Sequence, residues 1–487
     1  MKEKPVSVLT RRSFIRQAAC AALGTGALTA SIRDLRFINA AMAQSSITDY
    51  KALVCIFLAG GNDSNNLIIP TIPEEHADYT TIRTDVLAIP LSGAPNVVLP
   101  LSPLSSDGHD YGLHPACPEL ATLFQESKLA VLFNTGTLLY PMTRAQYQSG
   151  ILSRPPQLFS HSDQVTQWQT SVPDAPPLTG WGGRCADLLA AVQPGSPISL
   201  CVTLAGANTF EVGNIASQYS VSTSGAIALN GVSGSRLQTL TNLLALPHPN
   251  LQAKAYSDVG EHAIQTGGLL NTAIAPTSAP SYWTVPFPTT VTSPTGGLPF
   301  NSNLAAQLRM IARLIEAGSR SAAAGGFEMK RQIFFCQVGG YDLHSGQTPG
   351  VGQTAIGAHA NLLAELSQGM FAFQRAMDQL GLSNNVTTFT SSDFGRTFPC
   401  NGDGSDHGWG GHHLIMGGAV NGRRTYGRFP TLTVNGPDDT STGRWIPTTA
   451  VDQYFATLAS WFGVDSGNLN TVFPNLNRFA SSNLGFV

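Results

Sequence analysis

Acidic residues and histidines are concentrated in residues 390–413, a glycine-rich stretch that follows an apolar, β-type run at residues 386–390. Polar loops at the ends of strands are where α/β proteins usually carry out their chemistry. Carboxylates and imidazoles at this density could act as acids, bases or metal ligands. A solvated surface loop is the alternative interpretation. The candidate side chains in this stretch are Asp393, Asp406, His407 and His412.

Two other predicted strands end in the same way. The apolar run at residues 53–58 is followed by a glycine pair and Asp63, and the run at residues 332–338 by a glycine pair, Asp342 and His344. Each run is typical of a strand buried on both faces. Because the carboxyl ends of parallel strands lie at one edge of a sheet, these side chains are expected to converge with those of the first stretch. Taken alone, Asp63 could equally belong to a plain Asx turn.

Several carboxylates and imidazoles at one sheet edge would repel one another unless a positive charge lay between them. One or two divalent metal ions would meet that need. Mixed carboxylate and imidazole ligands suit Zn, Mn or Mg better than a soft ion, and Ca is retained as a further candidate. The predicted metal ligands are Asp63, Asp342, His344, Asp393, Asp406, His407 and His412.

Predicted strands and helices alternate along most of the chain. An apolar helical pattern at residues 116–127 leads into a strand at residues 129–133, and a helix at residues 304–317 precedes the strand at 332–338. A long helical pattern at residues 356–380 then leads back to the first stretch. This alternation favours an α/β fold with a mostly parallel central sheet covered by helices.

Residues 205–302 differ in composition from the rest of the chain, because they contain few charged residues and are rich in Ser, Thr, Gly, Pro and Ala. A disordered linker would normally be more charged and less aromatic. We therefore expect one domain over residues 44–487, with residues 205–302 as an insertion or cap folded over the core. A flexible lid is the alternative.

The overall composition limits the classes of function. The chain has 487 residues, a formal net charge of −3 and 12% charged residues, which argues against electrostatic binding of nucleic acid. Of its 7 cysteines none forms a CxxC pair, so a thiol redox or haem site is not indicated. Cys185 and Cys201 could form a disulfide in an oxidising compartment, but their connectivity stays open.

The N-terminus resembles a targeting segment. Arg11 and Arg12 precede a weakly apolar segment at residues 18–32, and Ala41-Met42-Ala43 offers an Ala-x-Ala cleavage site. This pattern predicts a twin-arginine signal peptide at residues 1–43 and export of the folded protein by the Tat machinery of a bacterium. The mature chain would be periplasmic or secreted, with no transmembrane segment. A basic N-terminal helix that is retained is the alternative.

Five short motifs together resemble a known family. They are GGND at residues 60–63, GGYDLH at 339–344, SDFGRT at 392–397, SDHG at 405–408 and NLGF at 483–486. They are similar to the "domain of unknown function 1501" family, in which a twin-arginine leader is common. That family in turn resembles the alkaline phosphatase/sulfatase superfamily.

The resemblance implies an alkaline-phosphatase-like, three-layer α/β/α sandwich with a metal site at the carboxyl edge of its sheet. It also implies hydrolysis of phosphate or sulfate esters. Two positions depart from the superfamily pattern: Phe394 stands where the superfamily has His, and only one residue separates Asp342 from His344.

The same resemblance suggests where a nucleophile would lie, since superfamily phosphatases use Ser or Thr. Ser162 is the candidate nucleophile, with His161 to activate or orient it. Arg154 could bind an anionic oxygen. A packed polar loop is the alternative interpretation of this segment.

These observations predict an exported metal-dependent hydrolase of phosphate or sulfate esters, acting on a small-molecule or polymer substrate. The alternative is a non-catalytic exported protein of the same fold that binds a glycan, a surface polymer or a partner protein.

Overall fold

The computed structural model describes residues 47–193, 195–227, 229, 231–247 and 250–487. The predicted signal peptide, residues 1–43, lies outside the described residues. Within the described part of the chain, no helix combines the length and the apolar character needed to cross a membrane.

A 10-stranded sheet forms the centre of the structure, in the order β14-β5-β13-β12-β1-β11-β6-β7-β8, with β15 also paired to β5. Strands β12, β1, β11, β6 and β7 run parallel to one another, whereas β13 is antiparallel to both β12 and β5, and β8 is antiparallel to β7. The strands are β1 (Lys51–Leu58), β5 (Leu129–Gly136), β6 (Cys201–Thr203), β7 (Tyr219–Ser222), β8 (Gly225–Ala226), β11 (Arg331–Val338), β12 (Val386–Ser392), β13 (Gly411–Met416), β14 (Thr425–Tyr426) and β15 (Thr449–Ala450).

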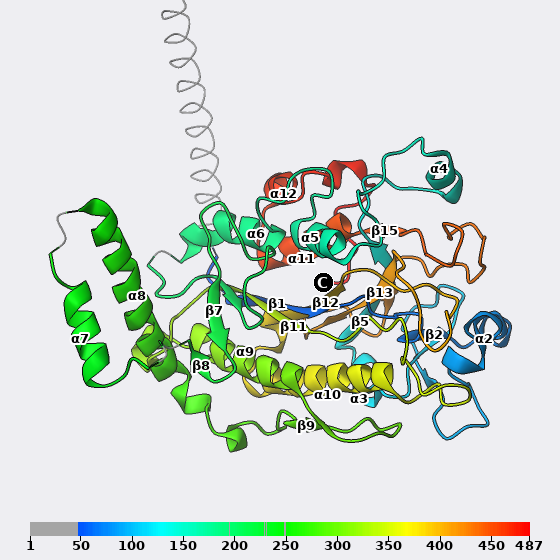
Figure 1. The fold of residues 1–487 in the computed structure, drawn as a ribbon, viewed down its shortest axis with the longest axis horizontal. Helices are drawn as coiled ribbons and strands as arrows, with labels where there is room; N and C mark the ends of the chain where they lie inside the picture. The colour runs from blue at the N-terminus through cyan, green and yellow to red at the C-terminus, as the bar shows by residue number, and fades with distance from the viewer. Residues whose placement is uncertain (1–46, 194, 228, 230, 248–249) are drawn as a thin grey trace, which may run out of the picture.

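Helices cover both faces of this sheet (Figure 1). One face is covered by α3 (Pro118–Gln125), α9 (Asn303–Ser319) and α10 (Ala358–Gln379). The opposite face is covered by α5 (His161–Thr170), α6 (Trp181–Leu189), α11 (Val451–Phe462) and α12 (Leu469–Val472). The predicted α/β fold class, with helices on both sides of a mostly parallel sheet, is confirmed.

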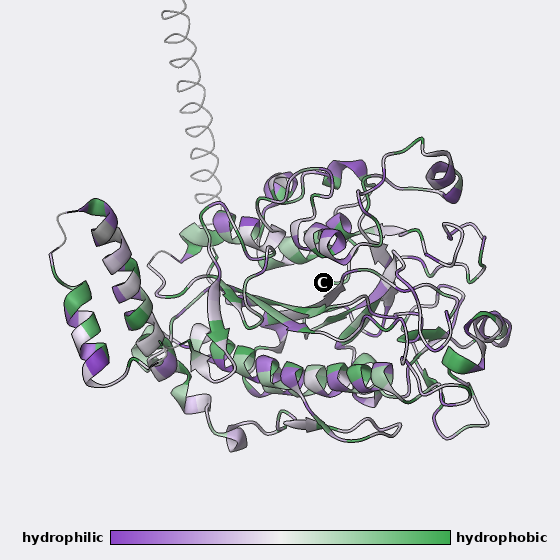
Figure 2. Cartoon of the chain, in the orientation of Figure 1, coloured by the Kyte–Doolittle hydropathy of each residue, from purple (hydrophilic) through white to green (hydrophobic). Residues whose placement is uncertain are grey.

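Strand β1 shows why the sheet is central. Its residues alternate between two hydrophobic cores: Val54 and Ile56 face the α9 and α10 side, whereas Leu53 and Phe57 face the α6 and α11 side. A strand that is apolar on both faces is stable only when both faces are covered. Figure 2 shows the same division, with mostly hydrophobic strands at the centre and a mixture of polar and apolar residues along α10.

The described part of residues 205–302 lies at one end of the sheet and alongside α10. Strands β7 and β8 extend the sheet, and α7 and α8 lie side by side and project away from it (Figure 1). A short pair of strands then leads to α9. The remaining elements of this segment are α7 (Ser235–Leu244), α8 (Leu251–Ile274), β9 (Thr290–Val291) and β10 (Phe300–Asn301).

A smaller sheet and two helices flank the other end. The sheet has the order β2-β4-β3. These elements are β2 (Ile68–Pro70), α2 (Pro73–Leu87), β3 (Leu99–Pro100), β4 (Tyr111–Leu113) and α4 (Arg144–Ser149). The cysteines of the described residues are all free, including Cys185 and Cys201, which are both buried.

Glu211 is a fully buried acid near β6. Its Oε2 accepts a hydrogen bond from Asn208 Nδ2 at 2.9 Å. Burial raises the pKa of this carboxyl from 4.5 to about 8, and the Asn208 hydrogen bond opposes that rise only in part.

Stability should therefore depend on pH through Glu211. The folded-state pKa is above the unfolded one, so the native protein should lose stability as the pH rises from about 4.5 to about 8. Glutamine keeps the shape of the side chain and cannot ionise. We expect E211Q to melt with the wild type near pH 5 and at a higher temperature than the wild type near pH 9, as measured by circular dichroism. E74Q, at an exposed position of α2, is the control. The same melting temperatures for E211Q and wild type at both pH values would contradict this prediction.

Candidate metal centre

The carboxyl ends of β12, β1 and β11 lie next to one another, because these strands are adjacent and parallel. The loops after them approach closely. Gly60 has φ +117°, and a Cβ at this position would lie 2.3 Å from the backbone nitrogen of Asp342. No other residue would allow this approach without moving the loop that carries Asp342.

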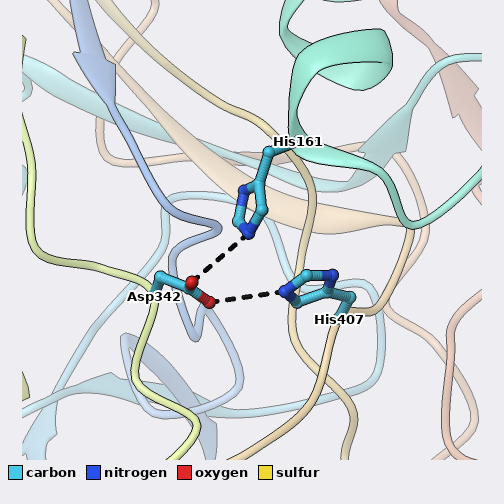
Figure 3. A group of neighbouring side chains, drawn as sticks. All are labelled: His161, Asp342 and His407. Carbon is cyan, nitrogen blue, oxygen red and sulfur yellow. Dashed lines mark hydrogen bonds and ion pairs between the residues drawn. The ribbon is translucent and has the colours of Figure 1, made fainter.

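Three imidazoles surround the carboxylate of Asp342. His161, the first residue of α5, places Nε2 3.4 Å from Asp342 Oδ2. His407, on the loop before β13, places Nε2 3.3 Å from Asp342 Oδ1. The potential ligand atoms of His161, Asp342 and His407 all lie within 4.8 Å of one another (Figure 3). His344 Nε2 lies 3.2 Å from Asp342 Oδ1 and 2.8 Å from His407 Nε2.

Each imidazole is held through its other nitrogen. His161 Nδ1 donates to Asp393 Oδ2 at 2.6 Å, and His344 Nδ1 donates to Asp406 Oδ1 at 3.0 Å. His407 Nδ1 donates to the carbonyl oxygen of Phe159 at 2.7 Å. Since a carboxylate or carbonyl only accepts, each bond favours a proton on Nδ1 and turns Nε2 towards the centre. Histidine ligands of metal ions are oriented in this way.

A cation fits between these groups. His161 Nε2 is buried and has no hydrogen-bond partner among the described residues. It faces a carboxylate, as does Nε2 of His407. Lone pairs and a carboxylate oriented towards one point repel one another unless a proton or metal ion lies between them. Imidazole nitrogen and carboxylate oxygen are ligands that Zn and Mn accept. The structure thus contains a His/Asp/His group able to hold a metal ion.

Arg396 keeps Asp342 ionised. Burial alone would raise the pKa of Asp342, but the hydrogen bond from Arg396 Nη1 at 2.9 Å, the charge of Arg396 and the nearby imidazoles lower it below its usual value. Burial also lowers the pKa of His407, against the opposing hydrogen bond to Phe159. Both shifts favour the protonation states of metal ligands, an anionic carboxylate and a neutral imidazole.

Phe394 forms one wall of the centre. Its ring centroid lies 4.8 Å from that of His161 and 4.6 Å from that of His407. The absence of a side chain at Gly61 makes room for it, because a Cβ there would lie 2.5 Å from the Phe394 ring. Position 394 thus carries an apolar ring that packs two imidazoles in place.

Asp63 lies apart from this group. Its carboxylate forms a buried ion pair with Arg83 and accepts a hydrogen bond from Gln347 Nε2 at 2.6 Å. Burial would raise the pKa of Asp63, but the charges of Arg83 and His359 and the hydrogen bonds from Gln347 and Arg83 together lower it below its usual value. The carboxylate is therefore neutralised by a protein cation inside the core.

His412 is also placed elsewhere. Its Nδ1 accepts a hydrogen bond from the backbone N–H of Asn134 at 3.1 Å, and its ring stacks on Phe429 with centroids 5.0 Å apart. Burial lowers the pKa of His412 to about 3. It is a neutral core histidine.

The other predicted residues have mixed placements. Asp393 and Asp406 belong to the centre as hydrogen-bond acceptors of imidazoles, one layer out from Asp342. Ser162 Oγ lies 3.3 Å from Asp163 Oδ2, and in the described part of the chain it makes no hydrogen bond to an imidazole. Arg154 stacks over the ring of Tyr147 at 4.8 Å and lines a surface pocket.

Sequence patterns gave no role to Arg396, Arg83 or the carbonyl of Phe159. Phe159 has φ +73°, which is uncommon for a residue with a side chain, and this conformation has no signature in the sequence. The charge of Arg396 was visible within the SDFGRT motif, but its burial against Asp342 depends on tertiary packing.

The comparisons with known proteins identify a family over one third of the chain. Residues 307–471 match the family described as "Protein of unknown function (DUF1501)", so the predicted resemblance to this family is confirmed there. No curated protein matches the chain.

Solved structures that resemble the chain include two with low sequence identity. The crystal structure of Ps i-CgsB in complex with k-i-k-neocarrahexaose has a TM-score of 0.35 and 8% identity, and the match covers 87% of this chain and 74% of that chain. The crystal structure of the PsFucS1 sulfatase from Pseudoalteromonas sp. has a TM-score of 0.30 and 11% identity, with 93% of this chain and 74% of that chain covered.

The geometry separates the role of Asp63 from that of Asp406. Replacing Asp63 leaves Arg83 buried without its partner, so we expect D63N to lower the free energy of unfolding by about 3–5 kcal/mol. Asp406 is half-exposed and pairs with the half-exposed His344, so D406N should change the stability by less than about 1 kcal/mol. Urea denaturation of both variants measures the difference. A D63N protein as stable as the wild type would contradict the structural role of the Asp63–Arg83 pair.

Proposed function

We propose that the chain is a metal-dependent hydrolase of phosphate or sulfate esters. One observation supports it above the others: His161, His344 and His407 each have Nδ1 bound to an acceptor and Nε2 directed towards Asp342. Such an arrangement is more than the buried Arg396 needs, because Asp342 alone pairs with it, and Asp342 and His344 are 47% and 45% exposed. It suits a solvent-accessible centre that binds an ion and a substrate.

The proposed ligands are His161, Asp342 and His407. Three protein ligands leave coordination positions open, as in catalytic rather than structural zinc sites. Zn or Mn fits the two imidazoles better than Mg or Ca, which prefer oxygen ligands throughout. When bound, such an ion would polarise an ester oxygen and acidify a water molecule.

The chain's own groups would supply orientation and proton transfer. Asp393 accepts a hydrogen bond from Gly60 N–H at 3.0 Å as well as from His161, so the first ligand is anchored to the loop after β1. His344, paired with Asp406 and exposed to solvent, is the proposed proton carrier. Its Nε2 could take a proton from an attacking water or deliver one to the leaving oxygen. Arg396 would keep Asp342 anionic throughout.

The alternative function, non-catalytic binding on the same fold, is favoured by one observation. Within the described residues, no serine or threonine hydroxyl is hydrogen-bonded to an imidazole of the centre. A protein that uses the metal only to hold a ligand would need no such nucleophile. Hydrolysis assays separate the two functions.

The metal centre can be tested by titration of the purified, chelator-treated protein with Zn²⁺ and Mn²⁺ in a calorimeter. We expect one site per chain, lost in D342N and H407A. D393N, which removes an orienting carboxylate, should weaken binding by about 10–100-fold. The control is H262A, at an exposed position of α8. Unchanged affinity in both D342N and H407A would overturn the assignment of ligands.

The role of His344 is tested with the metal-loaded protein and p-nitrophenyl phosphate and p-nitrophenyl sulfate. We expect H344A to keep its metal and to lose about 100-fold or more in kcat, because proton transfer typically contributes about that factor. Stoichiometric metal in the wild type without hydrolysis of either ester would favour the non-catalytic alternative.

Export is a separate part of the proposal. It is supported by Arg11 and Arg12 and by the Ala-x-Ala site at residues 41–43. We expect R11K/R12K to retain the precursor in the cytoplasm of a bacterial host, while the wild-type chain appears in the periplasm or medium with a shorter N-terminus. Cell fractionation and mass spectrometry measure both. Equal export of the two chains would contradict the Tat route.

A further inference from the structure

A surface pocket of about 560 Å³ lies between α4 and the segment that leads into α5. Its lining includes Tyr147, Ser153, Arg154, Gln157 and Phe159. Rings and hydroxyl, amide and guanidinium groups thus face the same space. A lining that combines aromatic faces with a few polar groups is typical of a site for an organic ligand.

The pocket has an uncompensated positive charge. Arg154 lies with its Cζ 4.8 Å from the centre of the Tyr147 ring, and no described carboxylate contacts its guanidinium. Arg478 lies at the same distance from the Tyr140 ring, but it is paired with Asp174 at 2.9 Å. Residues 144–159 contain two arginines and no acid. The exposed N–H groups of Arg154 are therefore available to an anion.

Phe159 joins this pocket to the metal centre. It lines the pocket, and its carbonyl accepts the hydrogen bond from His407 Nδ1 at 2.7 Å. Arg444 stacks on the Phe159 ring at 4.3 Å and donates from Nε to the carbonyl oxygen of His407 at 2.7 Å. A ligand seated in the pocket would thus contact the same residue that orients a proposed metal ligand.

Arg444, which stacks on the Phe159 ring, is fixed in place. Asp439, fully buried, accepts hydrogen bonds from the backbone N–H groups of Ser441, Gly443 and Arg444 at 2.8–3.1 Å. A carboxylate that accepts several backbone hydrogen bonds holds a loop in one conformation. The Phe159 ring, which lines the pocket, is therefore supported by a rigid loop.

We propose that this pocket is an anion-binding subsite for a polyanionic polymer substrate. It takes a sulfate, phosphate or carboxylate group that neighbours the ester cleaved at the metal centre. Arg154 binds the anion, and Tyr147 and the apolar rim contact the ring or chain that bears it. This inference rests on the proposed function, because it assigns to that centre a substrate with more than one anionic group.

Binding of dextran sulfate and of unsulfated dextran to the metal-loaded protein tests this subsite by calorimetry. We expect only the sulfated polymer to bind, and R154Q to weaken binding by about tenfold or more, since a charge-assisted contact is lost. R236Q is the matched control, because Arg236 is an exposed arginine on the projecting helix α7. It should bind within about twofold of the wild type.

Three results would overturn the subsite: no preference for the sulfated polymer, equal weakening in R154Q and R236Q, or inorganic sulfate binding as tightly as the polymer. The last result would indicate a site for free anions. The D342N variant separates this proposal from the hydrolase itself, because it should lose the metal and keep the Arg154-dependent binding of dextran sulfate. A metal-loaded wild-type protein that binds dextran sulfate through Arg154 but hydrolyses neither test ester would leave the subsite standing and the proposed catalysis refuted.

Discussion

The hydrogen bonds that three histidines donate from Nδ1 fix the orientation of the imidazoles at the carboxyl edge of the sheet. An imidazole that is free to rotate presents either nitrogen, and in either protonation state. Here each imidazole is held in one orientation by its own acceptor, which is Asp393, Asp406 or the carbonyl of Phe159. All three Nε2 atoms then lie next to the carboxylate of Asp342. The orientation of the three imidazoles therefore depends on acceptors outside the His161, Asp342 and His407 group.

Those acceptors are rigid because they are parts of the fold. Asp393 directly follows the buried central strand β12, and its second oxygen accepts a hydrogen bond from the backbone N–H of Gly60 in the loop after β1. The Phe159 carbonyl is held by a left-handed backbone conformation and by the Arg444 guanidinium stacked on its ring. Close packing at Gly60 and Gly61 sets the distance between loops. Orientation of the imidazoles is thus maintained by the same packing that stabilises the sheet.

Charge is distributed in two tiers around this edge. The inner tier is closed: Asp63 with Arg83 is buried and neutral as a pair, and it supports the loop after β1. The outer tier is open: Asp342, His344 and Asp406 are each about half exposed. Of the two tiers, the outer one is accessible to solvent.

The sequence alone determined the class of fold and the edge where polar groups gather. Apolar runs such as β1 can only be covered strands, and glycine pairs after them predict tight loops with acids at one edge. These local patterns suffice because burial and turn chemistry are properties of short segments. The family resemblance came from the same segments.

Tertiary structure alone decided which of these polar groups belong together. Asp63 and Asp342 occupy equivalent places after their strands, yet one pairs with Arg83 from α2 and the other faces three imidazoles. His161 and His412 also have different surroundings: the imidazole of His161 lies beside Asp342 at the sheet edge, and that of His412 is buried in the core. Whether a carboxylate is neutralised by an arginine, an imidazole or a metal depends on contacts between different elements, from 20 positions apart for Asp63 and Arg83 to 232 for His161 and Asp393. Such contacts follow from packing rather than from local sequence.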